Sequence, residues 1–231
     1  MRYIAIPLLI LGLFIPILSL PAMAQGQNEV ARLETATAVL REIMSIPEQG
    51  IPADLLRHSF GIAVIPNTMK VGLGIGGTYG QGIMVVRTAD GSWSEPGFVT
   101  LSGGSLGFQA GVQSSDLVLV FKTPRSVEAM HRGKFILGGT VSIAAGPVGR
   151  TAEANTDAQL AAEVYSYSRS RGLFAGVALQ GAQLAFNHDA NRAFYGVSDP
   201  IRTPARSFPM AARTFSCIVA QYTGAPSHVC A

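Results

Sequence analysis

The sequence contains few charged residues, and their signs nearly balance. Asp, Glu, Lys and Arg make up 13% of the 231 residues, whereas about 25% is typical of globular proteins. The formal net charge of +3 is too small for the basic surface that nucleic-acid-binding proteins carry, so we expect no nucleic-acid partner. It is enough for weak attraction to an anionic surface. Hydrophobic residues make up 48% of the chain, which argues against disorder over most of its length.

Metal-ligand clusters and cofactor motifs are also scarce. The four histidines are far apart in the sequence, and no two of them have the spacing of metal ligands. Residues 72–77 fit the pattern Gly-x-Gly-x-x-Gly of dinucleotide-binding loops. That pattern works where a strand leads into a helix, but Gly80 and Gly82 follow here and disfavour a helix. We therefore expect neither a metal nor a cofactor.

One candidate nucleophile, Ser105, stands in the Gly-x-Ser-x-Gly pattern of serine hydrolases at residues 103–107. In hydrolases this serine precedes a helix, whereas residues 108–112 include Gly111 and have the character of a strand. Its candidate general base, His228, stands close to Cys230 in a proline-rich segment. We therefore predict no catalytic residue and no enzymatic activity, with Ser105 in a tight turn. A hydrolase that uses Ser105 is the third alternative for the function.

The N-terminal residues have the pattern of an export signal. Arg2 precedes an apolar stretch over residues 3–20, and Ala22-Met23-Ala24 is a small-x-small cleavage site. We predict that residues 1–24 are removed as a signal peptide and that the protein is exported. An uncleaved membrane anchor is the alternative.

The two cysteines, Cys217 and Cys230, both lie in the C-terminal part of the sequence. Because an exported chain meets an oxidising compartment, we predict a disulfide bond between them; two free thiols are the alternative. The bond would close a loop of about 14 residues and stabilise the protein by about 3 kcal/mol. Prolines recur after Asp199 and predict a loosely attached C-terminal arm over residues 199–231.

Hydrophobic residues recur at helical spacing over residues 28–45. Leu33, Leu40 and Met44 fall on one face of the predicted helix, and Pro47 ends it. The first interpretation is that this face packs on the core. The alternative is an amphipathic helix that docks on a membrane or on a partner. A second, shorter helix is expected at residues 52–59.

From about Gly61 to Gly196 the sequence consists of short apolar strands separated by glycine. Glycine within a strand marks a bulge, a bend or the close approach of another backbone. Short helices are expected at residues 124–131 and 188–194. The pattern predicts an α+β fold with a curved, mainly antiparallel, glycine-rich sheet and the N-terminal helices packed against it. The predicted strands cover residues 62–65, 83–88, 98–101, 117–122, 135–137, 141–144, 164–170 and 173–186.

Several glycine-rich motifs follow one another in a specific order. They begin with Gly-Ile-Ala-Val-Ile-Pro at residues 61–66 and continue at residues 70–82, 90–96, 103–111, 144–150, 167–168 and 172–176. This order closely resembles the SYLF domain, the lipid-binding domain known from Ysc-type actin regulators. The resemblance covers residues 38–196, and with the N-terminal helix it places the domain at residues 25–198.

The resemblance implies a non-enzymatic domain that binds phospholipids, which in eukaryotic members are phosphoinositides. Bacterial members are exported, so it implies a module in the periplasm or at the surface of an envelope membrane. Actin cannot be the partner of such a protein. The sequence departs from the expected pattern at Gly139-Thr140, where alanine-aspartate is common, and at Gln180, where glutamate is common. Both changes remove a carboxylate and argue against an essential acid or cation ligand there.

Basic residues beside glycine-rich turns are candidates for binding an anionic lipid headgroup. Arginine donates two hydrogen bonds to one phosphate, and glycine-rich turns expose further N–H donors. We predict that Lys70 and Arg150 attract the headgroup, and further candidates are Arg169 and Arg171. In the same hypothesis, the acyl chains are contacted or shielded by Leu33, Leu40 and Met44.

Two alternatives to this lipid site remain open. Each of these basic residues, taken singly, is also explained as the solvated end of a strand. The whole protein is also explained as a structural or protein-interaction module of the envelope, without a lipid ligand and with an unknown protein partner.

Overall fold

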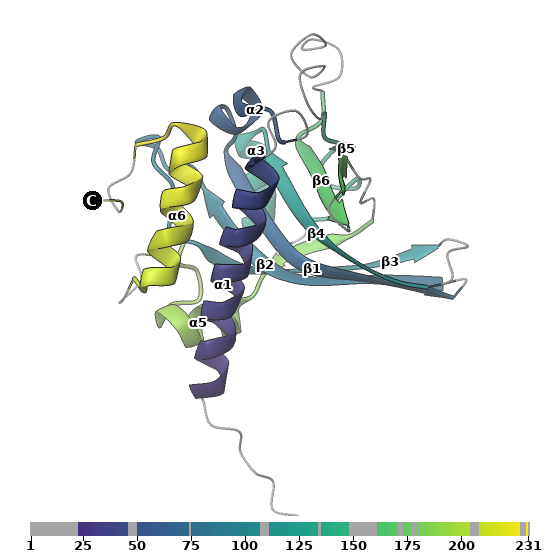
Figure 1. Ribbon diagram of the computed structural model, residues 1–231, viewed down its shortest axis with the longest axis horizontal. Coiled ribbons are helices and arrows are strands. Elements are labelled where there is room, and N and C mark those ends of the chain that lie inside the picture. Colours follow the sequence, from purple (N-terminus) through teal and green to yellow (C-terminus); the bar gives the residue numbers. More distant parts are fainter. Residues whose placement is uncertain are drawn as a thin grey trace, which may run out of the picture.

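The computed structural model describes residues 23–45, 50–73, 75–106, 111–133, 135–147, 161–170, 173–176, 179, 181–203, 208–226 and 230. Within this part of the chain, helices pack around one curled sheet (Figure 1). The helices are α1 (Met23–Met44), α2 (Ala53–Arg57), α3 (Pro124–His131), α5 (His188–Tyr195) and α6 (Met210–Thr223). The strands are β1 (Gly61–Leu73), β2 (Ile75–Val86), β3 (Gly97–Leu106), β4 (Gly111–Phe121), β5 (Ile143–Ala145), β6 (Val164–Ser170), β7 (Leu173–Gly176) and β8 (Gln183–Phe186).

The described strands form one eight-stranded sheet. Its order is β5-β6-β4-β1-β2-β3-β8, and β7 pairs with β6 beside this path. The pairing of β5 with β6 is parallel, and the other strand pairs are antiparallel. The turn between β2 and β3 contains Gly91, whose φ of 85° is left-handed and suits the Asp-Gly signal in the sequence. The predicted α+β fold with a curved, mainly antiparallel sheet is confirmed.

The inner half of the sheet is buried on both faces, and each face has its own hydrophobic core. Along β1, Ile62 and Val64 lie in the core under the helices, while Ala63 and Ile65 lie in the opposite core. All four side chains are buried because successive residues of a strand face opposite sides of the sheet and both sides are covered. This explains the continuous apolar runs of the sequence in this region.

Helices supply most of the cover on the first face. Helices α1 and α6 lie side by side across it (Figure 1), and Leu33 of α1 and Phe215 of α6 are buried there. On the second face, Val127 and Met130 of α3 lie in the opposite core. The N-terminal helix therefore packs on the sheet, as its apolar face predicts.

Side-chain caps explain where the two short helices begin, at the positions that the sequence predicts. Thr123 Oγ1 accepts a hydrogen bond from the Ser126 N–H at 3.2 Å, at the start of α3. Asn187 Oδ1 accepts one from the Ala190 N–H at 3.0 Å, at the start of α5. Each cap satisfies one backbone donor that the first turn of a helix leaves free.

Strand β1 continues beyond Pro66, where the sequence predicts that the strand ends. Its register against β2 shifts between Val64 and Met69, which marks a β-bulge. Asn67 lies in the bulge with a φ of 49°, a left-handed conformation that asparagine adopts more readily than most residues. Its N–H donates to Asp116 Oδ1 at 3.0 Å. Because a bulge leaves backbone groups unpaired, it accepts proline, and the strand continues past this point instead of ending.

The prediction of a loosely attached C-terminal arm is wrong where helix α6 lies. Phe215 and Val219 of α6 are buried in the core under the helices. Trp93 Nε1 donates a hydrogen bond to Thr223 Oγ1 at 2.8 Å, which joins the end of α6 to the segment before β3. The prolines are misleading because Pro209 stands directly before the first turn of α6, where no backbone donor is needed.

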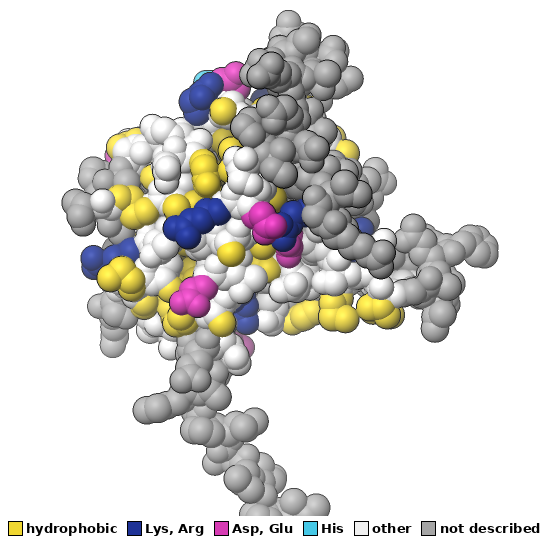
Figure 2. Space-filling model, viewed as in Figure 1, with side chains coloured by type: hydrophobic (Ala, Val, Ile, Leu, Met, Phe, Trp, Pro, Cys, Tyr) yellow, Lys and Arg dark blue, Asp and Glu magenta, His cyan; other side chains and the backbone are white. Residues whose placement is uncertain are grey.

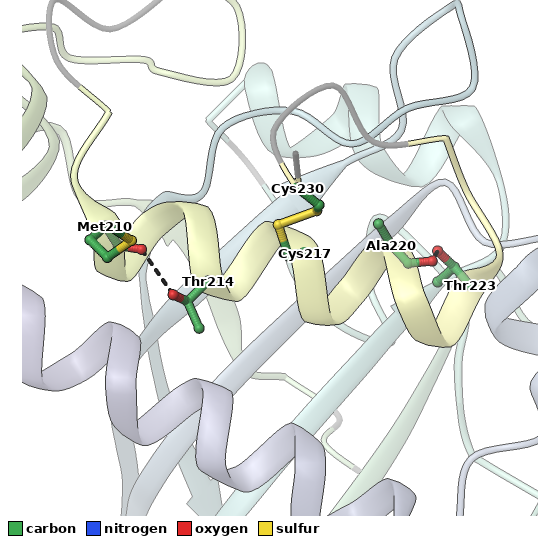
Figure 3. Close-up of a disulfide and its surroundings, with 6 residues drawn as sticks. All are labelled: Met210, Thr214, Cys217, Ala220, Thr223 and Cys230. Atoms are coloured by element: carbon green, nitrogen blue, oxygen red, sulfur yellow. Dashed lines mark hydrogen bonds between the residues drawn. A yellow bond between two sulfur atoms is a disulfide. The ribbon is translucent and has the colours of Figure 1, made fainter.

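Cys217 of α6 forms a disulfide bond with Cys230, with 5.4 Å between the two Cα atoms (Figure 3). This is the pair that the sequence predicts. One of its ends, however, lies on a helix that packs on the core, and not in an arm. The bond therefore holds residue 230 against α6.

Helix α1 begins at Met23, within the predicted cleavage site and before the predicted mature N-terminus at Gln25. Cleavage stays a prediction, since residues 1–22 lie outside the described part of the chain. Among the described residues, no helix has both the length and the hydrophobicity needed to cross a membrane.

Candidate functional site

The outer halves of four strands extend beyond the helices and form a projection that we call the tongue. The tongue consists of residues 68–73 of β1, 75–82 of β2, 102–106 of β3 and 111–115 of β4. In Figure 1 these strand ends project to the right, away from α1, α5 and α6. The inner halves of the same strands lie between the two cores. Within the part of the chain that the structure describes, the tongue thus continues the sheet beyond the helices that cover it elsewhere.

The tongue carries almost no charge. Of its residues, Lys70 alone has a charged side chain, and none is acidic. The first acidic residue at its base is Asp116 of β4. An extended surface without carboxylates does not repel anionic molecules, and it loses little hydration when it is covered.

One face of the tongue is apolar and exposed. Met69 pairs with Tyr79 across β1 and β2, and Val71 pairs with Val112 across β1 and β4, so all four lie on one face. Val112 is 68% exposed and Tyr79 is 52% exposed. Figure 2 shows hydrophobic side chains along the lower border of this projection. Most other large side chains of this kind are buried in the described part, so this face is unusual for the protein.

The β-bulge puts these residues on one face. Before the bulge, the even residues Ile62 and Val64 point toward the helices; after it, the odd residues Met69 and Val71 do so. Without the shift of one residue, Thr68 would pair with Tyr79, and Lys70 would pair with Val112 on the face that is now apolar. The bulge therefore puts Lys70 on the other face of the tongue, away from the apolar residues. There Lys70 pairs with Thr78 of β2 and with Gln113 of β4.

Glycines let the strands approach closely where the tongue begins. A Cβ on Gly82 would lie 2.3 Å from the carbonyl oxygen of Val64, and one on Gly80 would lie 2.7 Å from Ile65 Cγ2. These positions are next to the bulge, and no side chain fits there. The expectation that strand glycines mark the close approach of another backbone is confirmed at Gly82.

A crevice of about 450 Å³ separates the apolar face from α1, and Arg32 of α1 lines it. Arg32 Nη2 donates to Gln81 Oε1 at 2.8 Å, and Gln81 Nε2 donates to the Tyr79 hydroxyl at 2.9 Å. Burial lowers the pKa of Arg32, and the charge of Glu29, 3.8 Å away, opposes this effect. This chain of hydrogen bonds holds Tyr79 at the root of the apolar face.

Arg169 does not supply a free charge for a headgroup. It forms ion pairs with Glu42 of α1 and with Asp116 of β4, the latter at 3.0 Å. Burial lowers the pKa of Arg169, but the hydrogen bonds and charges of the two carboxylates outweigh burial and raise it above the ordinary value. Arg169 therefore connects α1, β4 and β6 at the base of the tongue. This arrangement gives it a structural role, and its role in lipid binding stays a prediction.

The structure does not bring together those of the other predicted lipid-binding residues that it describes. Lys70 lies in the tongue and is half-buried, whereas Arg150 and Arg171 lie outside the described residues. Leu33 and Leu40 are buried in the core under the helices, and Met44 packs against it. The expectation that this helix face offers apolar surface to acyl chains is wrong in this conformation, because the face covers the sheet.

The structure does not form a nucleophile elbow at Ser105. Its backbone lies inside β3 and pairs with Gly76, so Ser105 is in a strand and not in the predicted tight turn. The predicted base His228 lies outside the described residues. Residues 72–77, which fit the dinucleotide pattern, form strand ends of β1 and β2 where they are described. Among the described residues, no group of three or more potential metal ligands is found.

The apolar face of the tongue is the feature that the sequence patterns do not reveal. Strand alternation read straight through Pro66 puts Met69 and Val71 on the face opposite to the correct one. One signal was nevertheless present in the sequence: residues 68–82 and 102–115 contain no acidic residue.

Comparisons with known proteins agree on one family. Residues 102–206 match the family model Ysc84, described as "Las17-binding protein actin regulator". SH3 domain-containing YSC84-like protein 1 of Homo sapiens is 37% identical over 174 residues, which cover 73% of this chain and 51% of the human protein. LAS seventeen-binding protein 3 of Saccharomyces cerevisiae strain YJM789 is 40% identical over 152 residues, which cover 64% of this chain and 33% of the yeast protein. The chain thus spans about half the length of the human relative, and the name of the yeast relative describes a binding protein.

Proposed function

Because this chain belongs to the Ysc84 (SYLF) family, we propose that it is a non-enzymatic module that binds phospholipid membranes, with the tongue as the contact. The observation that carries the proposal is the exposed apolar face of Met69, Val71, Tyr79 and Val112 on an extension without acidic residues. Such a face is favourable against lipid and unfavourable in water. Tyr79 has the amphipathic ring that is favoured at the boundary between acyl chains and headgroups.

The expected energies indicate which interaction dominates. Fully burying an exposed Val or Met side chain contributes about 1.5–3 kcal/mol, so four side chains that are about half exposed contribute on the order of 4 kcal/mol. A single lysine near an anionic surface contributes about 1 kcal/mol. Apolar contact therefore outweighs attraction by Lys70, and binding should depend only weakly on salt. This differs from a site in which basic residues hold the headgroup.

We further propose that the membrane belongs to the bacterial envelope, with the module in the periplasm or on a membrane surface. The export pattern of residues 1–24 supports this location. The disulfide between Cys217 and Cys230 suits an oxidising compartment. In that location actin is no partner, and the actin regulation that the description of the family model names does not carry over.

The test is flotation of the purified protein with vesicles of phosphatidylcholine, with and without phosphatidylglycerol, at low and at high salt. We expect Val112→Asp to reduce the bound fraction at least tenfold, a difference of about 1.4 kcal/mol, because a carboxylate resists transfer from water. Met210→Asp is the matched control, since Met210 is 78% exposed but lies on α6, away from the tongue. It should leave binding unchanged. Equal binding of both variants and the wild type overturns the tongue as the contact.

A second candidate is a protein-interaction module without a lipid ligand. It is favoured by the name of the yeast relative, which describes a Las17-binding protein, and by the fact that an exposed apolar face also suits a protein surface. Wild-type protein that does not float with either kind of vesicle would decide for this candidate.

A further inference from the structure

The tongue has two open edges. The outer strands of the tongue are β3 and β4. On the side away from β2, β3 pairs with β8 through Val99–Ser102; on the side away from β1, β4 pairs with β6 through Asp116–Phe121. Beyond these pairs, residues 103–106 of β3 and 111–115 of β4 have no strand partner on their outer sides within the described part of the chain. Unpaired strand edges of this kind can pair with another strand.

Neither edge carries the features that usually prevent pairing. Natural sheet edges are blunted by charged side chains, proline or bulges. Here the sequences are Gly-Gly-Ser-Leu at residues 103–106 and Gly-Val-Gln-Ser-Ser at residues 111–115. Neither contains a charge or a proline, and the one register shift of β1 lies at the base of the tongue. The edges are therefore suited to pairing.

Unpaired backbone groups at the open edges cost more free energy in lipid than in water. In water, the outward N–H and C=O groups bind water molecules, whereas in acyl chains these groups must find partners within the protein. The proposed contact surface adjoins these edges: Val112 lies on β4, and Tyr79 lies on β2, which pairs with β3. When this face of the tongue enters lipid, the two edges enter lipid with it. Binding to the membrane therefore favours pairing of each edge with another strand.

We propose that neighbouring copies of this chain pair edge to edge on the membrane, β3 of one copy with β4 of the next. The proposal rests on the proposed function of the tongue. Strands β3 and β4 run antiparallel to each other, since each is antiparallel to one strand of the antiparallel pair β1–β2. Two copies in the same orientation therefore join these edges as an antiparallel pair, and their apolar faces stay on the same side.

The position of α1 selects this arrangement over a two-fold dimer. Asn28 and Arg32 of α1 line the crevice beside Met69 and Tyr79, so the helix stands on the same side as the apolar face. The face cannot lie flat on a plane, and the tongue must enter with its outer end first (Figure 1). An antiparallel two-fold pairing of two identical edges would put the bodies at opposite ends of the joined sheet, one of them inside the membrane. A parallel two-fold pairing would keep the bodies at one end but turn the two apolar faces to opposite sides. Pairing β3 with β4 keeps all bodies on one side and allows more than two copies to join.

Cross-linking with introduced cysteines tests the pairing. Gly104 of β3 and Ser114 of β4 are both exposed, and a Cβ on Gly104 meets no atom closer than 4.0 Å. The two native cysteines are joined to each other, so a maleimide reacts with introduced thiols. A bismaleimide of about 10 Å spans neighbouring strands, which lie about 4.8 Å apart, and tolerates a shifted register. The reagent is applied to Gly104→Cys, Ser114→Cys, their mixture and the double variant, with and without vesicles.

Each outcome has one meaning. We expect the vesicle-bound double variant to give a ladder of dimers and larger species, the mixture to give dimers only, and each single variant alone to give none. Cross-linked dimers of a single variant indicate a two-fold interface and overturn the arrangement. Flotation without cross-linking overturns the pairing but leaves lipid binding in place, whereas absence of flotation overturns both. Equal cross-linking without vesicles contradicts the role of the membrane.

Discussion

The inner half of β1 and its outer half both carry large hydrophobic side chains on the side of the helices, but with opposite exposure. Ile62 and Val64 are fully buried, whereas Met69 and Val71, on the same side of the same strand, are about half exposed. The difference arises from the cover: helices lie over the inner half, and the outer half extends past them. Hydrophobic residues that continue along a strand after its cover has ended are not explained by the core, and they indicate a partner from outside the chain.

The largest expected effect is on stability, and it tests whether the inner half is covered and the tongue is exposed. Leu33→Ala empties part of the core over the inner half and should lower the free energy of unfolding by about 3 kcal/mol. Val112→Ala in the tongue should change it by less than about 0.5 kcal/mol, because an exposed side chain leaves no cavity. Urea unfolding followed by circular dichroism measures both. A large loss of unfolding free energy for Val112→Ala would mean that the tongue is covered in solution. That result would contradict the difference in exposure between the two halves of β1.

The boundary between the two halves is tested by a pair of glycines on β2. An alanine at position 82 would place its Cβ 2.3 Å from the Val64 carbonyl oxygen and 2.8 Å from Ile65 Cα. At Gly77, further out in the tongue, the nearest atom would be 3.9 Å away. Gly82→Ala should therefore destabilise the protein by about 2–3 kcal/mol, since backbone must move, while Gly77→Ala should be nearly neutral. Similar unfolding midpoints for the two variants would show that the bulge does not fix the strands here.

The inner half is the part of the fold that the sequence predicts well. Its apolar runs, the turn at Gly91 and the caps of α3 and α5 are local signals, and local signals determine where elements begin and end. The tongue and α6 are missed for a common reason. Pro66 and Pro209 are read as breaks in structure, yet one lies in a bulge and the other before a first helical turn, where proline is tolerated.

The predicted site differs from the candidate site of the structure for another physical reason. Basic residues were judged by sequence context, but whether a charge is free depends on what packs against it in three dimensions. Arg169 is neutralised by Glu42, which is distant in sequence and belongs to another element. Likewise, the spacing of Leu33 and Leu40 shows that they share a helix face, but not whether that face meets the sheet or a membrane.

The smallest expected effect concerns Lys70, the one charge of the tongue. Lys70 lies on the other face of the tongue from Tyr79 and Val112. It can therefore contact a membrane only if the tongue enters with its outer end first, so that both of its faces meet headgroups. Lys70→Ala should then weaken binding to vesicles with phosphatidylglycerol about fivefold, which corresponds to about 1 kcal/mol. The loss should disappear at high salt and on phosphatidylcholine alone, because a screened or absent surface charge attracts nothing.

Lys122→Ala is the matched control, since it removes the same charge from the residue that directly follows β4, at the end of that strand farthest from the tongue. If both variants lose the same affinity for the vesicles, the attraction depends on the net charge of the protein. The result would then not show how the tongue is oriented on the membrane. If Lys70→Ala has no effect where Val112→Asp abolishes binding, the apolar face alone contacts lipid and the tongue lies tilted onto that face. A loss larger for Lys70→Ala than for Val112→Asp would reverse the comparison, because attraction of the headgroup would then outweigh apolar burial.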